Sequence, residues 1–272
     1  MSDARPIGLM DSGVGGLTVL KETAALLPNE DILYLGDSAN MPYGEKTNEE
    51  IIKFANQDIA FLESKGVKAI VLACNTVSSL VDHVTARVPL VSIVDAGCAA
   101  VLESCNKGKV GLIATTATVR NRTYEKKMAA LTSDVQFISH GTKHLAQAIN
   151  DNIEEKKALV KYIVNAIDPI LRQHGISKIL LGCTHYPIVK ETMESLYPMV
   201  HIINPAEMQV KDLIRSLNGA EGLNPQKTKG NIKLYFTGDA SNRQSFVDIA
   251  NILELPYNEL KHVTLDAFEK EE

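Results

Sequence analysis

The 272-residue sequence lacks several features that mark other classes of protein. It has no tryptophan, and none of its apolar runs approaches the roughly 20 residues that a membrane-spanning helix needs. The opening stretch MSDARPIGLMDSG reaches charge and glycine too early for a secretory signal peptide. The formal net charge of -5 argues against binding to nucleic acid or to an anionic membrane. We therefore expect a cytoplasmic globular protein.

Cysteine is scarce, and its spacing disfavours the common cysteine motifs. The four copies are Cys74, Cys98, Cys105 and Cys183, and none forms a C-x-x-C pair. A zinc ribbon and a thioredoxin-like site are therefore not expected. A reducing cytosol would keep all four as thiols. Nothing polar is arranged around Cys98 and Cys105, so for these two we expect ordinary buried positions and no metal site.

The glycine motifs that bind nucleotides are also missing. The stretch IGLMDSGVGGLTVLKE has the spacing G-x-G-G rather than G-x-G-x-x-G, and no Walker A sequence occurs. What remains is a carboxylate, Asp11, and a hydroxyl, Ser12, before glycines whose backbone N–H groups can hold a small anion. A helix cap or turn residue is the alternative interpretation of Asp11. In GDSANMPYGEKT, a tight turn at Tyr43–Gly44 could point its amides into a cleft.

Short apolar runs alternate with amphipathic helical patterns, which predicts an α/β fold with parallel strands and right-handed crossovers. Most runs are continuous rather than alternating, as in strands that are buried on both faces. Residues 47–66 and 152–175 place apolar residues at helical spacing, and Gly66 and Gly175 follow them as expected C-caps. The predicted strands are 6–11, 31–37, 68–74, 90–95, 109–115, 135–139, 178–183, 200–204 and 232–238.

One helix–glycine–strand–cysteine unit occurs twice. KGVKAIVLACNT and HGISKILLGCTH align when the sequence is shifted by 109 residues, which superimposes Cys74 on Cys183. Each cysteine ends a predicted parallel strand, where open α/β sheets bind their ligands. The polar residues that follow can start a helix, and a helix N-terminus or a charged histidine lowers a thiol pKa. We therefore expect two reactive thiols on facing units, with chance likeness of two helix–strand units as the alternative.

Five stretches together carry a resemblance to a known family. They are DSGVGGLTVL, GDSANMPYGEKT, VLACNT, LGCTHYP and the TGD at residues 237–239, in this order along most of the chain. With them the sequence resembles the glutamate racemases, cofactor-independent isomerases of the aspartate/glutamate racemase superfamily. The resemblance implies two similar parallel-sheet α/β domains related by pseudo-twofold symmetry, with the active site in the cleft between them. It places residues 1–96 and 207–272 in the first domain and residues 97–206 in the second.

The resemblance also implies the function and the site. The activity is interconversion of L- and D-glutamate without pyridoxal phosphate or another cofactor, which supplies peptidoglycan synthesis, and the assembly is a homodimer. The two bases fall on Cys74 and Cys183, and the assisting groups on Asp11 and His185. For His185, position alone leaves open an exposed or capping histidine. The implied substrate contacts are Asp11, Ser12, Tyr43, Gly44, Asn75, Thr76, Thr118, Thr184 and His185.

The chain departs from the family pattern between residues 135 and 155. Many glutamate racemases have an alanine–cysteine–proline stretch there, followed by an acidic pair, whereas this chain reads VQFISHGTKHLAQAINDNIEE. A substrate contact from Glu154 or Glu155 is correspondingly doubtful, and a neighbouring specificity such as aspartate stays open. A non-catalytic protein that binds small acids is the alternative from another class, but it would not need both thiols.

Overall fold

The computed structural model describes residues 2–152, 155–265 and 268. Its strands form two sheets in which every pairing is parallel. The larger sheet has the order β10-β9-β2-β1-β3-β4 and the smaller one β6-β5-β7-β8. The strands are β1 Ile7–Asp11, β2 Ile32–Gly36, β3 Ala69–Leu72, β4 Leu90–Ser92, β5 Gly108–Ala114, β6 Val135–Gly141, β7 Lys178–Gly182, β8 His201–Ile203, β9 Ile232–Phe236 and β10 Glu259–His262.

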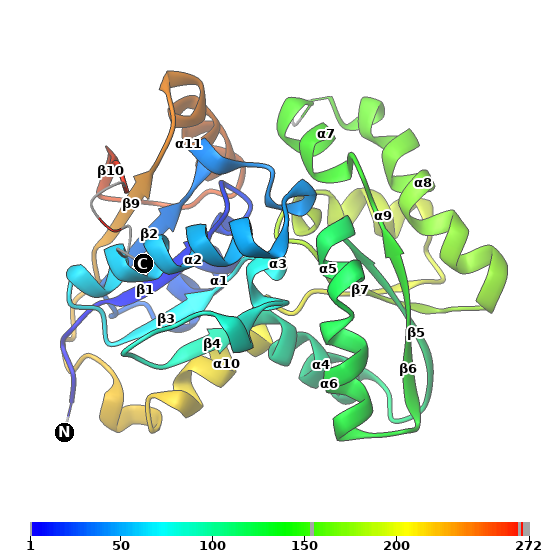
Figure 1. Cartoon of the computed structure of the whole chain (residues 1–272), viewed down its shortest axis with the longest axis horizontal. Helices are drawn as coiled ribbons and strands as arrows, with labels where there is room; N and C mark the ends of the chain where they lie inside the picture. The colour runs from blue at the N-terminus through cyan, green and yellow to red at the C-terminus, as the bar shows by residue number, and fades with distance from the viewer. Residues whose placement is uncertain (1, 153–154, 266–267, 269–272) are drawn as a thin grey trace.

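Helices cover both faces of each sheet, as Figure 1 shows. One face of the larger sheet packs with residues from α1, α10 and α11, and the other with residues from α2. In the smaller sheet, α7, α8 and α9 contribute to one core cluster and α4 and α6 to the other. The helices are α1 Leu17–Leu26, α2 Asn48–Ser64, α3 Asn75–Ser78, α4 Ile93–Ser104, α5 Thr116–Asn121, α6 Thr123–Leu131, α7 Leu145–Asp151, α8 Lys156–His174, α9 Lys190–Leu196, α10 Ala206–Ser216 and α11 Ala240–Ile252.

Local signals in the sequence explain where the elements begin and end. Thr47 and Glu50 form a capping box at the start of α2. Gly66 and Gly175 take the left-handed conformation, with φ of 75° and 61°, after α2 and α8. The strand predicted over 90–95 ends early because the Ser92 hydroxyl accepts from the N–H of Val94 and begins α4.

All nine predicted strands are confirmed within a few residues, and β10 is a tenth that the sequence analysis missed. The predicted repeat is visible in the topology. The order β2-β1-β3-β4 in the larger sheet recurs as β6-β5-β7-β8 in the smaller one. The 109-residue shift carries β3 onto β7. The predicted fold class, two similar parallel-sheet α/β units, is therefore confirmed.

The chain enters the larger sheet twice. Its strands come from residues 7–92 and again from residues 232–262, while the smaller sheet uses residues 108–203. In Figure 1 the blue start and the orange end of the chain accordingly share the left half, and the green segment forms the right half. The predicted domain limits stay a prediction, because α4 runs without a break across residues 96 and 97. Within the described residues, no helix is long and apolar enough to cross a membrane.

Candidate active site

A cavity of about 400 Å³ lies where the carboxyl ends of the two sheets face each other. Ser12 and Cys74 reach it just beyond β1 and β3 of the larger sheet, and Thr115 and Cys183 just beyond β5 and β7 of the smaller one. The repeated units therefore contribute equivalent positions to one cavity. The predicted residues that line the cavity are Ser12, Tyr43, Gly44, Cys74, Asn75, Thr76, Cys183, Thr184 and His185.

The Cys74 side of the cavity is built from hydroxyls and an amide. The Cys74 thiol donates to Ser12 Oγ over 3.5 Å and is 4% exposed. Cys74 precedes the short helix α3, whose first residue, Asn75, accepts at Oδ1 from the Tyr124 hydroxyl over 2.7 Å. This bond leaves the Asn75 Nδ2 as the donating end of the amide. Thr76 Oγ1 lies 3.0 Å from Thr115 Oγ1 of the other sheet.

The Cys183 side has a histidine beside the thiol. His185 Nδ1 lies 3.9 Å from Cys183 Sγ, and His185 Nε2 is buried without a hydrogen-bond partner among the residues that the structure describes. His185 is 6% exposed and Cys183 is 7% exposed. His185 is therefore not the exposed histidine that its position in the sequence left open. The next residue, Tyr186, is also buried, and its hydroxyl forms a hydrogen bond with Thr142 Oγ1.

Asp11 lies behind the cavity wall rather than on it. It is fully buried and accepts at Oδ2 from the N–H groups of Gly13 and Gly16 over 3.2 and 3.1 Å. Its Oδ1 accepts from the Thr184 hydroxyl over 3.2 Å. Asp11 therefore joins the glycine turn of one half to the Cys183 motif of the other, and it reaches the cavity only through Thr184.

Thr118 also lies one layer back from the cavity. It is 1% exposed, and its hydroxyl lies 2.9 Å from Thr115 Oγ1. Thr115 is the residue of this stretch that lines the cavity. The sequence stretch IATTATVRNRTYE contains both threonines, and Thr115 is the one that directly follows β5. Strand-end position was thus the signal that could have selected Thr115.

Burial changes the acidity of every titratable group at the centre of the site. It raises the pKa of the Cys74 thiol to about 11, with the negative charge of Asp11 adding to the effect, and that of Cys183 to about 12. Burial also raises the pKa of Asp11 to about 6 and lowers that of His185 to about 4. Burial therefore outweighs the pKa-lowering effect that we expected from a helix N-terminus, and it leaves the histidine neutral.

Two helices contribute cavity residues that the sequence analysis did not identify. Near the end of the 135–155 segment, α7 supplies Ala146, Gln147, Asn150 and Asp151, and α11 supplies Asn242 and Ser245. Glu155 begins α8 and is exposed outside the cavity wall, while Glu154 lies outside the described residues. Among the described residues, no group of three or more His, Cys, Asp or Glu could hold a metal ion.

A profile of the Asp/Glu/Hydantoin racemase family matches residues 7–213, which is well over half of the chain. The chain belongs to the Asp/Glu/Hydantoin racemase family. The matched residues, 7–213, contain both cysteine motifs and the glycine turn at Asp11.

Individual members of the racemase family resemble the chain over nearly its whole length. A glutamate racemase of Latilactobacillus sakei subsp. sakei (strain 23K) is 37% identical over 250 residues, which cover 90% of this chain and 89% of that one. A glutamate racemase from Francisella tularensis, solved in complex with D-glutamate, superimposes with a TM-score of 0.86 at 32% identity and covers 97% and 99% of the two chains.

A solved structure of lower sequence identity shows likeness in the fold alone. The aspartate racemase of Picrophilus torridus is 20% identical, with a TM-score of 0.62 over 79% of this chain and 94% of that one. The two-sheet architecture therefore extends beyond the glutamate racemases.

Proposed function

We propose that this member of the racemase family interconverts L- and D-glutamate with two cysteines and no pyridoxal phosphate. The observation that carries the proposal is that Cys74 and Cys183 line one cavity from equivalent strand ends of two similar sheets. The likeness to a glutamate racemase at 37% identity supports glutamate as the substrate. The setting we propose is a cytoplasmic homodimer that supplies D-glutamate for peptidoglycan synthesis.

The reaction itself requires two groups. To invert the α-carbon, a base removes the α-proton from one face and an acid delivers a proton to the other. A single side chain would have to cross the substrate between the two steps. A thiolate and a thiol on opposite walls exchange roles with the direction of reaction, and we assign Cys74 to D-glutamate and Cys183 to L-glutamate.

Formation of the thiolate is the first demand on the site. With thiol pKa values raised to about 11 and 12 by burial, both cysteines are protonated near neutral pH in the free protein. The ammonium group of the substrate brings a positive charge beside them, which favours the thiolate. His185 is neutral, since burial lowers its pKa to about 4, and it serves as a hydrogen-bond partner of Cys183 rather than as a cation.

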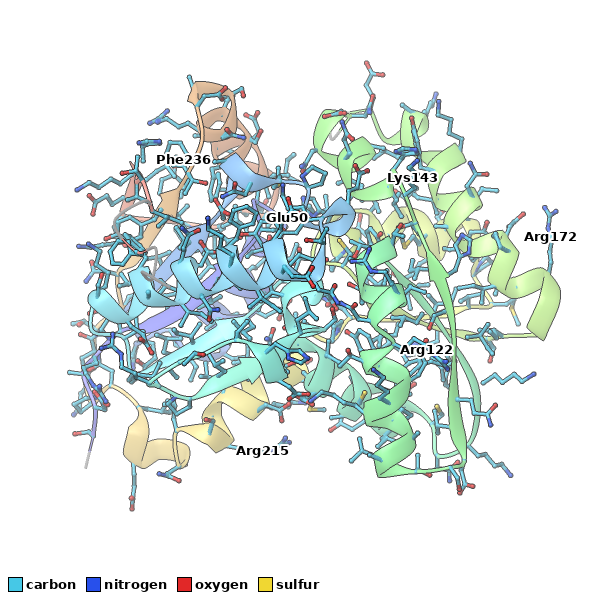
Figure 2. The ribbon with its side chains drawn as sticks, viewed as in Figure 1. Glu50, Arg122, Lys143, Arg172, Arg215 and Phe236 are labelled. Carbon is cyan, nitrogen blue, oxygen red and sulfur yellow. The ribbon has the colours of Figure 1, made fainter. Side chains whose placement is uncertain are left out.

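Stabilisation of the developing negative charge is the second demand. An amino-acid α-proton is far less acidic than a thiol, and each tenfold in rate requires about 1.4 kcal/mol. Within the described part of the chain, no lysine or arginine lines the cavity. Figure 2 shows Arg172 and Arg215 projecting from the edges of the molecule, with side chains 78% and 64% exposed. We therefore propose that hydroxyls, the Asn75 amide and backbone N–H groups bind the substrate carboxylates.

The supporting contacts have their own parts in this proposal. Asp11 orients Thr184, and Thr118 orients Thr115, so each acts through a residue on the wall. Ser12 accepts from the Cys74 thiol, and Tyr43, Gly44 and Thr76 complete the same side. The remaining proposed contact, His185, lies beside Cys183.

Circular dichroism of D-glutamate tests the proposal directly. After dialysis and treatment with hydroxylamine, which traps carbonyl cofactors, the purified chain should still abolish the signal. D-Aspartate assayed in parallel tests the neighbouring specificity. If the signal of D-aspartate decays faster than that of D-glutamate, aspartate is the preferred substrate. Activity that disappears on treatment and returns with pyridoxal phosphate would contradict the cofactor-independent mechanism.

A further inference from the structure

The hydroxyl of Tyr43 lies between two buried carboxyl groups next to the active site. Its oxygen is 2.6 Å from Asp37 Oδ2 and 3.4 Å from Asp58 Oδ2, so the two carboxyl groups approach within about 6 Å of each other. Both aspartates are fully buried, and Tyr43 is 1% exposed on the cavity wall. Nothing in the proposed mechanism uses Asp37 or Asp58.

Hydrogen-bond partners distinguish the two carboxyl groups. Asp37 is well supplied with donors, because Asn40 Nδ2 and the Tyr43 hydroxyl reach Oδ2 and the Thr237 hydroxyl reaches Oδ1. All three groups donate to Asp37, so none of these bonds needs a proton from that carboxyl group. Asp58 has fewer partners. Among the described residues, its Oδ1 is buried without a hydrogen-bond partner, and its Oδ2 contacts the Tyr43 oxygen alone.

A proton count then assigns the charge. Tyr43 has one hydroxyl proton, and the short contact directs it to Asp37. The Tyr43 oxygen can still accept, so a hydrogen bond to Asp58 requires that Asp58 supply the proton. Burial, followed by the negative charges of Asp37 and Asp11, raises the pKa of Asp58 well above its ordinary value, although the contact with the Tyr43 hydroxyl acts in the opposite direction.

We propose that Asp58 is a positioning residue that stays protonated and donates to Tyr43, which holds the turn at Pro42–Gly44 in place on the cavity wall. The chain of donors runs from Asp58 through Tyr43 to Asp37. It adds to the packing of the Tyr43 ring against Phe54, 5.8 Å between centroids, and to the backbone bond from the N–H of Lys46 to the Tyr43 carbonyl.

The turn is a sensitive place for such control because it meets both halves of the molecule. A Cβ at Gly44 would lie 3.0 Å from Thr115 Cβ, across the cavity on the other sheet. Asp37 ties the same region to the end of β9, since Thr237 donates to Asp37 and accepts from the N–H of Ala39. A shift of the turn therefore moves substrate-facing backbone and alters the fit between the halves.

Kinetics of variants at the two partners test the positioning role. Asp58→Asn keeps a neutral donor of the same shape, so its KM and kcat for glutamate should stay within about threefold of wild type. Asp58→Ala removes the donor and should raise KM at least tenfold with a smaller change in kcat. Tyr43→Phe should raise KM similarly, and the double variant Asp58→Ala/Tyr43→Phe should add little. Asp82→Asn, which removes one exposed carboxylate elsewhere, is the control.

A spectroscopic measurement tests the protonation without activity. The infrared spectrum of the wild type near neutral pH should contain a carboxylic-acid C=O band that is missing from Asp58→Asn and present in Asp82→Asn. The kinetic readout rests on the proposed function, whereas this band does not, so the two can fail separately. Identical spectra for wild type and Asp58→Asn, or a KM rise in Asp58→Asn as large as in Asp58→Ala, would overturn the inference. A wild-type KM in Asp58→Ala would do so as well.

Discussion

Thr184 and Asp11 lie 173 positions apart, and the hydroxyl of one donates to the carboxyl of the other over 3.2 Å behind the cavity. A second bond parallels it, from the Thr18 hydroxyl to the Thr184 carbonyl over 3.0 Å. Two hydrogen bonds therefore connect the segment at the start of α1 to the Cys183 motif beneath the cavity. This arrangement explains why the glycine turn belongs to the active site although its glycines carry no side chain.

A substitution at Gly15 tests whether this connection constrains the site. A Cβ at this position would lie 2.4 Å from His185 Nδ1 and 2.5 Å from Thr184 Oγ1. Gly15→Ala should displace both side chains and lower kcat/KM for glutamate by roughly 100-fold. Gly66→Ala is the control, because a Cβ there would have no atom of the described residues within 4 Å, although φ is 75°. It should cost about 1–2 kcal/mol of stability and leave the kinetics unchanged. Equal kinetics for the two variants would show that the turn does not constrain the site.

His185 should make the protein sensitive to acid. Burial lowers its pKa from 6.5 to about 4, so between these values the unfolded chain binds a proton that the folded chain does not. Stability is therefore lost as pH falls through this window. From pH 7 to pH 5, the wild type should lose about 2 kcal/mol more free energy of unfolding than His185→Asn.

Urea unfolding of both proteins at the two pH values measures this difference. Asp11, whose pKa burial raises to about 6, titrates in both proteins, so its opposite contribution cancels. Equal losses in the two proteins would mean that His185 is charged or solvated in the folded state.

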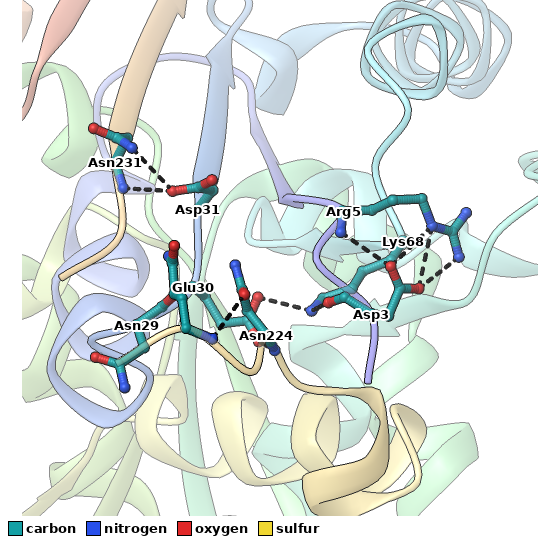
Figure 3. A network of polar contacts seen from close by, with 9 residues as sticks. Asp3, Arg5, Asn29, Glu30, Asp31, Lys68, Asn224 and Asn231 are labelled. Atoms are coloured by element: carbon teal, nitrogen blue, oxygen red, sulfur yellow. Dashed lines mark hydrogen bonds and ion pairs between the residues drawn. The ribbon is translucent and has the colours of Figure 1, made fainter. Parts of the chain in front are cut away.

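The opposite end of the larger sheet has a structural ion pair, shown in Figure 3. Lys68 Nζ lies 2.7 Å from Glu30 Oε2 and donates to the Asp3 carbonyl over 2.8 Å, and both side chains are nearly inaccessible. Lys68→Met leaves the Glu30 charge buried and unpaired, so the free energy of unfolding should fall by about 3–5 kcal/mol. The variant should keep its kinetics while folded, because Lys68 precedes β3 and Cys74 follows it.

Denaturant unfolding of Lys68→Met beside Arg5→Met gives the comparison. Arg5 pairs with Asp3 at the surface with its own side chain 59% exposed, and loss of that pair should cost about 0–1 kcal/mol. Similar losses for the two variants would mean that the Lys68–Glu30 pair contributes no more than a surface pair.

The sequence predicted most of the fold because buried parallel strands leave an unmistakable pattern of apolar runs. It missed β10, whose residues ELKH are mostly polar and mostly exposed because β10 is an edge strand of the described sheet, next to β9. The motif residues of the site could be found because they directly follow strands. The contributions of α7 and α11 could not, since long-range packing, and no local pattern, brings Asn150 and Asn242 to the cavity.

Acidity was the property least visible in the sequence. A helix start and a histidine beside Cys183 favoured lowered thiol pKa values, yet burial raises the pKa of both the Cys74 and the Cys183 thiol. Whether burial or the helix N-terminus dominates the thiol pKa depends on how much water the fold excludes from the thiols. That exclusion arises only when the two sheets face each other. The Asp58–Tyr43 contact was hidden for the same reason, because 15 positions of sequence separate two unremarkable residues.

The central claim is that Cys74 and Cys183 serve opposite faces of the substrate. Serine is a far weaker acid and a poor base, so Cys74→Ser and Cys183→Ser should each lose several powers of ten in racemisation, at about 1.4 kcal/mol per power. Deuterium from the solvent should enter mainly the product enantiomer of the wild type in each direction.

Elimination from a glutamate analogue with a leaving group on nitrogen tests the claim most directly, because it needs one base only. The base takes the α-proton, a C=N bond forms, and the N–leaving-group bond breaks with its electron pair. Cys74→Ser should retain elimination from the L analogue, and Cys183→Ser from the D analogue. If both variants favour the same enantiomer, or if either one racemises glutamate at the wild-type rate, the two cysteines do not serve opposite faces.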